Sequence, residues 1–229
     1  VYFDLENRPC ILSDRQLWRR DGGIWIAADL GAAQRTATVG DGAIVASSSK
    51  IAFNSDNDLY VPGVPGYTAT WNRTTKQLSE PTLVGYGPPA NDVHNSPSIT
   101  IDGEGYLHLL VGTHGQPFPY TRSIEPNDTA AGWTAAQPMG DARQTYIGLV
   151  TGPDGTLHSV FRMWRTGEPP HPASHHAVLA YSRKRPGEAW STPVPLVVSP
   201  FSEYSVFYHR LTIDHTGRLF LSYDYWSTF

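Results

Sequence analysis

The sequence has little that would support a cross-linked, membrane-spanning or helical protein. Cys10 is the one cysteine among 229 residues, so an intramolecular disulfide is excluded. No run of about 18 or more apolar residues occurs, so we predict no membrane-spanning helix. Apolar residues alternate or come in short runs, and they do not keep the spacing of an amphipathic helix. These absences favour a fold built from strands.

The composition is that of many short strands joined by tight turns. There are 21 glycines and 19 prolines, and aromatic residues make up 12% of the chain. Hydrophobic residues reach 40%, which is enough to bury a core. The net charge of -4 argues weakly against a nucleic-acid surface. We therefore predict one all-β domain over residues 1–229, with neither nucleic acid nor membrane as a partner.

A repeat runs along the chain. A turn rich in Asp, Asn and Gly is followed by a leucine and then by an aromatic residue or a histidine. The leucines of its four copies are Leu59, Leu107, Leu157 and Leu219. They lie roughly 50 to 60 residues apart, close to the period of β-propeller blades. We predict a β-propeller of four-stranded antiparallel blades, with four to five blades in this chain.

The first complete hairpin predicted by the repeat carries two histidines at its open end. Facing residues of an antiparallel hairpin lie equally far from its turn, and side chains alternate between the two faces. With the turn centred at Glu104, His94 and His114 are equally distant from it. They are therefore predicted to face each other at the end away from the turn.

The next hairpin gives a second facing pair. With its turn centred at Asp154, Tyr146 and Arg162 are predicted to face each other at the open end. Adjacent blades would bring this pair beside the two histidines. Imidazoles, a phenol and a guanidinium suit a site that binds an acidic group and moves a proton.

The third hairpin, centred near Thr216, repeats the arrangement. Tyr208 takes the place of Tyr146, and Asp224 takes the place of Arg162, although a bulge would shift this register by one residue. His209 and Arg210 follow, and they would add positive charge for a sulfate or uronate or form a structural ion pair.

Two further features leave alternatives open. Trp164 shares a strand face with Arg162, and it would either stack on a sugar ring or pack within the blade. The stretch GEPPHPASHH carries His171, His175 and His176, but its spacing matches no strong zinc motif. A solvated loop is the favoured interpretation.

The stretch DVHNSP at 92–97 and the downstream Gly-Thr-His114 resemble the BNR-4 repeat family, and the spacing of Tyr146 and Arg162 is similar to that of its ulvan lyases. The similarity runs from about residue 45 to 229. This family contains seven-bladed propeller polysaccharide lyases and relatives acting at rhamnose–glucuronate linkages. The resemblance implies the same fold, of which this chain would cover only part.

The resemblance also implies roles for individual residues. His94 and Tyr146 would be the acid and base, His114 would help to hold the acidic sugar, and Arg162 would neutralise the uronate carboxylate. Tyr204 would contact the substrate, with Tyr208 as the competing candidate. The full set of expected substrate-binding residues is Asn95, Trp164, Tyr204, Tyr208, His209 and Arg210.

The expected reaction is β-elimination at a rhamnose–uronate linkage of an acidic, sulfated polysaccharide such as ulvan, giving a 4,5-unsaturated uronate. Arg162 would stabilise the enolate-like intermediate. Either His94 would be the acid, or Tyr146 would be both base and acid in a syn elimination. Catalysis would need no cofactor or metal, although the resemblance leaves room for a structural zinc or calcium ion. We expect a secreted or periplasmic monomer.

Two other classes of function stay open. One is a non-catalytic propeller that binds glycans, because a fold does not fix a function. The other is a glycoside hydrolase on the same scaffold, of the rhamnosidase type. A sialidase would need three converging arginines, and Arg162 has no evident pair of partners in the equivalent strands.

Overall fold

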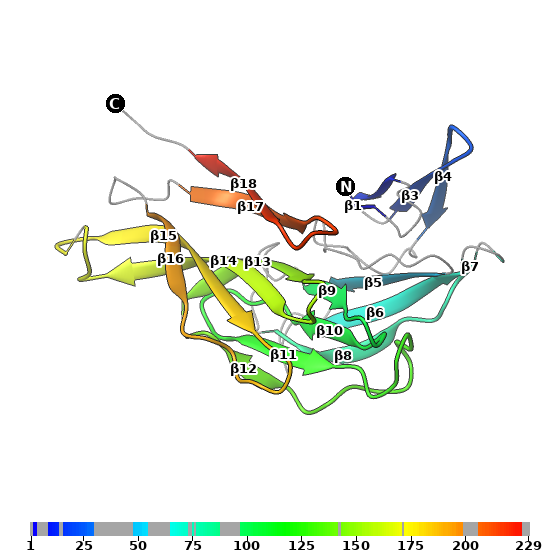
Figure 1. The fold of residues 1–229 in the computed structure, drawn as a ribbon, viewed down its shortest axis with the longest axis horizontal. Helices are drawn as coiled ribbons and strands as arrows, with labels where there is room; N and C mark the ends of the chain where they lie inside the picture. Colours follow the sequence, from blue (N-terminus) through cyan, green and yellow to red (C-terminus); the bar gives the residue numbers. More distant parts are fainter. Residues whose placement is uncertain are drawn as a thin grey trace.

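The computed structural model describes residues 2–3, 9–13, 16–29, 48–54, 65–72, 75, 77–87, 97–141, 143–170, 172–198 and 206–225. Its regular elements are all β-strands, arranged in five antiparallel sheets (Figure 1). Within these ranges no helix is long and apolar enough to cross a membrane. The predicted all-β architecture is confirmed.

Each sheet is formed by strands that follow one another in the sequence. The first two sheets consist of β1 (Tyr2–Phe3), β2 (Pro9–Ser13), β3 (Gln16–Asp21) and β4 (Ile24–Asp29), and of β5 (Ser48–Asn54), β6 (Pro65–Asn72), β7 (Gln77–Leu78) and β8 (Thr82–Tyr86). The next two consist of β9 (Ser98–Ile101), β10 (Leu107–Leu110), β11 (Phe118–Arg122) and β12 (Gln137–Met139), and of β13 (Gln144–Thr151), β14 (Leu157–Thr166), β15 (His175–Lys184) and β16 (Val194–Val198). The last is a pair, β17 (Val206–Ile213) and β18 (Leu219–Tyr225).

The repeated turns close hairpins, as the sequence predicts. Leu107, Leu157 and Leu219 each begin the second strand of a hairpin, whereas Leu59 lies outside the described residues. The side chain of Asp102 explains the tightness of the first turn, because its Oδ1 accepts hydrogen bonds from the backbone N–H groups of Glu104 (3.0 Å) and Tyr106 (2.8 Å).

Neighbouring sheets pack through their first strands. β13 lies between β9 and β17. The hydroxyl groups of Thr100 and Thr151 are 2.9 Å apart, which joins β9 to β13. On the other side Gly148 lets β13 approach β17, since an added Cβ would lie 3.0 Å from Cβ of Leu211. This succession of sheets, each face to face with the next, is the arrangement of propeller blades.

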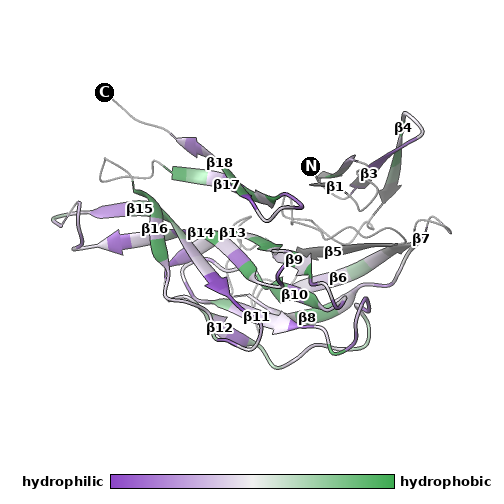
Figure 2. Ribbon diagram, in the orientation of Figure 1, coloured by the Kyte–Doolittle hydropathy of each residue, from purple (hydrophilic) through white to green (hydrophobic). Residues whose placement is uncertain are grey.

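The core fills the spaces between consecutive sheets. The largest cluster joins the β9–β12 and β13–β16 sheets, where the rings of Phe118 and Phe161 meet edge to face at 5.5 Å. A second cluster, with Val160 and Leu211, joins the β13–β16 sheet to β17. Each fully buried side chain of this size contributes about 1.5–3 kcal/mol. Hydrophobic segments lie mainly on the strands, whereas the turns are mostly hydrophilic (Figure 2).

Candidate functional site

Two tyrosines at equivalent places in neighbouring sheets adopt a backbone conformation that is rare outside glycine. Tyr146 in β13 has φ 54° and Tyr208 in β17 has φ 48°. Each lies at a β-bulge, where one strand carries an extra residue. Such a conformation costs on the order of 1–3 kcal/mol and persists only where surrounding contacts hold it. The two bulges turn both tyrosines out of the regular alternation.

Because of the bulge, the predicted pairing of Tyr146 with Arg162 in the second hairpin is wrong by one residue. The register follows the prediction up to Ile147, which pairs with Phe161. Beyond the bulge Thr145, not Tyr146, pairs with Arg162, because Tyr146 is the inserted residue. The third hairpin shows the anticipated shift, since Phe207 pairs with Asp224.

Tyr146 and Arg162 are nevertheless in contact. Arg162 is 1% exposed, and its guanidinium carbon lies 4.4 Å from the ring centre of Tyr146. It also lies 5.6 Å from the ring centre of Trp164. The rings of Tyr146 and Tyr208 meet edge to face at 5.4 Å. A buried guanidinium therefore lies against a half-buried phenol, and the largely exposed Tyr208 extends this cluster across to the next sheet.

Trp164 has one ring face covered. The imidazole of His175 stacks on it at 4.4 Å between ring centres, with an angle of 7° between the planes. Nδ1 of His175 in turn lies 2.6 Å from the hydroxyl group of Thr166. The prediction of a solvated loop for this stretch is wrong at its end, because His175 begins β15 and His176 is buried in that strand. Packing within the sheet thus accounts for one face of Trp164.

His114 lies near the same end of β13, but not on a strand. β10 ends at Leu110, so His114 belongs to the following loop, where it is exposed. The backbone N–H of Gly115 donates a hydrogen bond to the carbonyl of Gln144 at 2.9 Å, which holds this loop against the start of β13. His94, Asn95 and Tyr204 lie outside the described residues.

His209 differs from the expectation of a substrate-facing cation. It is 2% exposed, and its Nε2–H donates to the carbonyl of Val160 in β14 at 2.8 Å. Burial lowers the pKa of His209 to about 4, and the charges of Arg210 and Arg162 act in the same direction. His209 is therefore neutral near pH 7 and ties β17 to β14. Arg210 is exposed, and its guanidinium donates to the carbonyl of His209 at 2.9 Å.

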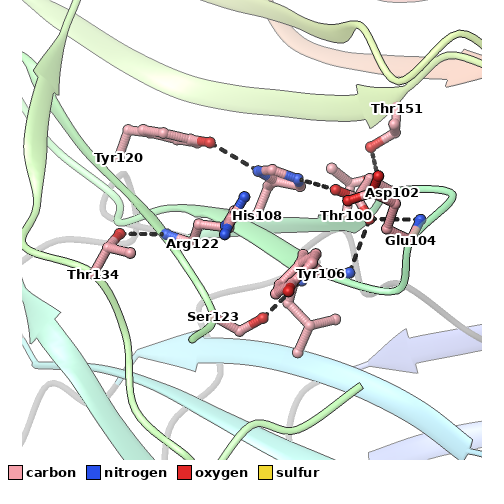
Figure 3. Close-up of polar contacts among 11 residues, drawn as sticks. Thr100, Asp102, Glu104, Tyr106, His108, Tyr120, Arg122, Ser123, Thr134 and Thr151 are labelled. Atoms are coloured by element: carbon pink, nitrogen blue, oxygen red, sulfur yellow. Dashed lines mark hydrogen bonds and ion pairs between the residues drawn. The ribbon is translucent and has the colours of Figure 1, made fainter. Parts of the chain in front are cut away.

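A second polar cluster occupies the other end of the same sheets, at the hairpin turns (Figure 3). Nδ1 of His108 lies 2.8 Å from the hydroxyl of Tyr120, and its Nε2 lies 3.0 Å from Oδ2 of Asp102. Burial lowers the pKa of His108, although Asp102 opposes this shift, and burial raises the pKa of Tyr120 to about 12. A cavity of about 350 Å³ adjoins this cluster.

No metal site is found among the residues that the structure describes, since no group of three or more His, Cys, Asp or Glu side chains could hold an ion there. His171 and the side chain of Cys10 lie outside those residues.

Known proteins share both the sequence pattern and the fold. Residues 64–226 match the model of a BNR repeat-containing family, whereas no curated protein matches the chain. Among solved structures, the chain is similar to an ulvan lyase from a new family of polysaccharide lyases, with a TM-score of 0.63 and 18% identity. A structure described as this lyase bound to -[GlcA(1-4)Rha3S]- gives a TM-score of 0.62, also at 18% identity.

Both comparisons cover 85% of this chain and 47% of the other, so the chain spans about half the length of the solved structures that it matches. At this identity the likeness establishes the fold. The family model covers more than half of the chain, and the match includes the hairpins that carry both tyrosine bulges. The chain therefore belongs to the BNR repeat-containing family.

Proposed function

We propose that the protein is a polysaccharide lyase that cleaves a rhamnose–uronate linkage by β-elimination and leaves a 4,5-unsaturated uronate. The observation that carries the proposal is the buried guanidinium of Arg162, 4.4 Å from the ring of Tyr146. It combines a fixed positive charge with a phenol held at a bulge. The structural likeness to ulvan lyases supports the choice of an acidic, sulfated polysaccharide.

The chemistry needs a cation because the C5 proton of a uronate is not acidic while the carboxylate carries its full charge. Arg162 would pair with that carboxylate and stabilise the negative charge that develops as the proton leaves. The buried position of its side chain strengthens this interaction, since a charge acts over a low local dielectric there. Tyr146, beside the guanidinium, would accept the C5 proton as a phenolate.

The leaving oxygen at C4 then needs a proton. Tyr146 would return the proton in a syn elimination, or His94 would donate one from the opposite side. His114 would help to hold the acidic sugar, since its loop lies at the start of β13. Tyr208 would contact a neighbouring sugar, because its ring is 52% exposed and packs on that of Tyr146. A polymer of this kind is met outside the cytoplasm, so we place the protein in a secreted or periplasmic compartment.

The test is ultraviolet absorbance during incubation with ulvan, and in parallel with gum arabic and a glucuronan. A rising absorbance from the unsaturated uronate supports elimination, and the polymer that responds identifies the substrate class. Release of free rhamnose without absorbance would instead indicate a hydrolase. Binding without any product would indicate a non-catalytic glycan-binding propeller.

Tyr146→Phe is the variant that isolates the proposed base. It removes the hydroxyl and keeps the ring against Arg162, so we expect turnover to be lost while the unfolding midpoint is unchanged. Tyr181→Phe is the matched control, since it removes a phenol in the same sheet, at the turn end and away from the cluster. Equal turnover of Tyr146→Phe and the unsubstituted protein would remove Tyr146 from the acid–base role.

A further inference from the structure

A cavity separate from the tyrosine cluster opens between the β9–β12 and β13–β16 sheets. It has a volume of about 350 Å³, within the range of small-molecule sites. Its walls include the turns at 102–104, 153–155 and 184–187. Tyr146 lies near the first residue of β13, whereas the turn at 153–155 comes after the last residue of that strand. The cavity and the proposed active site thus lie at opposite ends of the strands.

Two cations in the cavity wall lack an acidic partner. Arg122 lies with its guanidinium carbon 4.1 Å from the ring centre of Tyr106, and its buried Nε has no hydrogen-bond acceptor within the described ranges. Nζ of Lys184 lies 6.0 Å from the ring centre of Tyr120 and donates to the carbonyl of Glu188. Neither forms an ion pair with any carboxylate that the structure describes.

Two of the three carboxylates in the wall are already engaged. Asp102 accepts hydrogen bonds from two backbone N–H groups and from His108. Asp154 accepts from the backbone N–H and the hydroxyl group of Thr156, at 3.0 and 2.9 Å. Glu104, in the turn, is exposed. These carboxylates keep their charge but are held by their own turns, so Arg122 and Lys184 are the groups in the wall that an anionic ligand can pair with.

The back wall is a rigid chain of hydrogen bonds (Figure 3). A carboxylate only accepts, so Nε2–H of His108 donates to Asp102, and Nδ1 of His108 accepts from the hydroxyl of Tyr120. The ring of Trp190, in the connection between β15 and β16, meets that of Tyr120 edge to face at 5.5 Å and supports it. This wall is held in place before any ligand enters, which lowers the cost of binding.

We propose that this cavity binds the carboxylate or sulfate group of an acidic sugar through Arg122 and Lys184, as a second, non-catalytic carbohydrate site. Anion binding follows from the two cations and the cavity alone, whereas the choice of an acidic sugar rests on the proposed function. Arg122 lines the cavity from β11 and Lys184 lines it from β15, so a guanidinium and an ammonium can each donate to one anionic group between the two sheets. A polymer held here as well as at the tyrosine cluster would gain avidity.

The test is calorimetric titration of the protein with glucuronate, with rhamnose 3-sulfate and with inorganic sulfate. We expect a saccharide to bind, and Lys184→Gln and Arg122→Gln each to weaken that binding at least tenfold. Arg183→Gln is the matched control. Arg183 faces His158 across neighbouring strands, as Arg122 faces His108, but Arg183 does not line the cavity. Lys184→Gln keeps the test valid should Arg122→Gln fail to fold.

The outcomes separate this site from the proposed active site. Saccharide binding that is weakened in Lys184→Gln but retained in Arg162→Met supports the cavity site, even where no unsaturated product forms. Binding of sulfate alone would overturn the sugar assignment. Saccharide binding that is equal in Lys184→Gln, Arg183→Gln and the unsubstituted protein would overturn the site itself.

Discussion

Acidification should destabilise the protein through His209. This side chain is buried at the contact between β17 and β14, where its Nε2–H already donates to the carbonyl of Val160. Its Nδ1 is buried and has no acceptor within the described residues. A second proton would therefore create a buried charge close to Arg162 and Arg210, and its new Nδ1–H would have no hydrogen-bond acceptor among the described residues. The folded protein resists that protonation, whereas the unfolded chain does not.

The magnitude follows from the shift in pKa. The pKa of His209 is about 4 in the folded protein, against an ordinary value of 6.5 for a histidine. Because the folded-state value is the lower one, the unfolded chain binds more protons between these limits. The contribution of His209 to stability is fully present above about pH 6.5 and is lost as the pH falls toward about 4. The loss from this one group is on the order of 3 kcal/mol.

The measurement is urea unfolding at a series of pH values between 4 and 7.5, compared with His209→Gln. Glutamine keeps a donor for the Val160 carbonyl but does not titrate, so its stability should fall less steeply with acid. Taking the difference between the two proteins removes the contributions of His108 and His158, whose pKa values burial also lowers. The exposed His215, substituted to Gln, is the control for removing an imidazole from the surface. Parallel curves for His209→Gln and the unsubstituted protein would refute the reasoning.

Three further predictions concern the proposed active site and the packing of β13, the strand that carries Tyr146. Arg162→Met should lower kcat/KM by about 10²–10³-fold, the cost of losing a donor that stabilises developing charge, and should lower the free energy of unfolding by up to about 2 kcal/mol through the lost contact with Tyr146; normal product formation would show that Arg162 is only structural. Gly148→Ala should cost about 1–3 kcal/mol in urea unfolding, because the new methyl would crowd Leu211; an unchanged midpoint would mean that β13 and β17 separate easily. His114→Ala should slow turnover of the polymer while leaving the melting temperature intact, since the side chain is exposed; equal rates would remove His114 from the site.

The hairpins were predictable because residue types within each turn determine where the chain reverses. An Asp at the start, Gly near the tip and Leu at the first position of the returning strand fix where each chain reverses. Leu107 accordingly faces Ile101, and Leu157 faces Thr151. The polar residues near the open ends of two hairpins could then be assigned by counting, which placed Tyr146 close to Arg162, although the bulge makes Thr145 the residue that pairs with Arg162.

The bulges were not predictable at the same level. A positive φ is usually found at Gly, Asn or Asp, so the sequence does not predict it at Tyr146 and Tyr208. What holds them is tertiary packing between sheets, which local sequence does not reveal. The same limit applies to His209, whose polar side chain gave no indication of burial, and to the cavity beside His108, which exists only where two sheets meet.

The paired bulges have a consequence for engineering and for evolution. The backbone device that presents Tyr146 recurs at Tyr208, but Asp224 stands where the first copy has Arg162. The fold therefore presents a bulged tyrosine on two neighbouring sheets. The residue type on the facing strand decides which of the two sheets also carries a cation there. Asp224→Arg would give the β17–β18 hairpin the same pairing of an arginine strand with a bulged tyrosine, without any new fold.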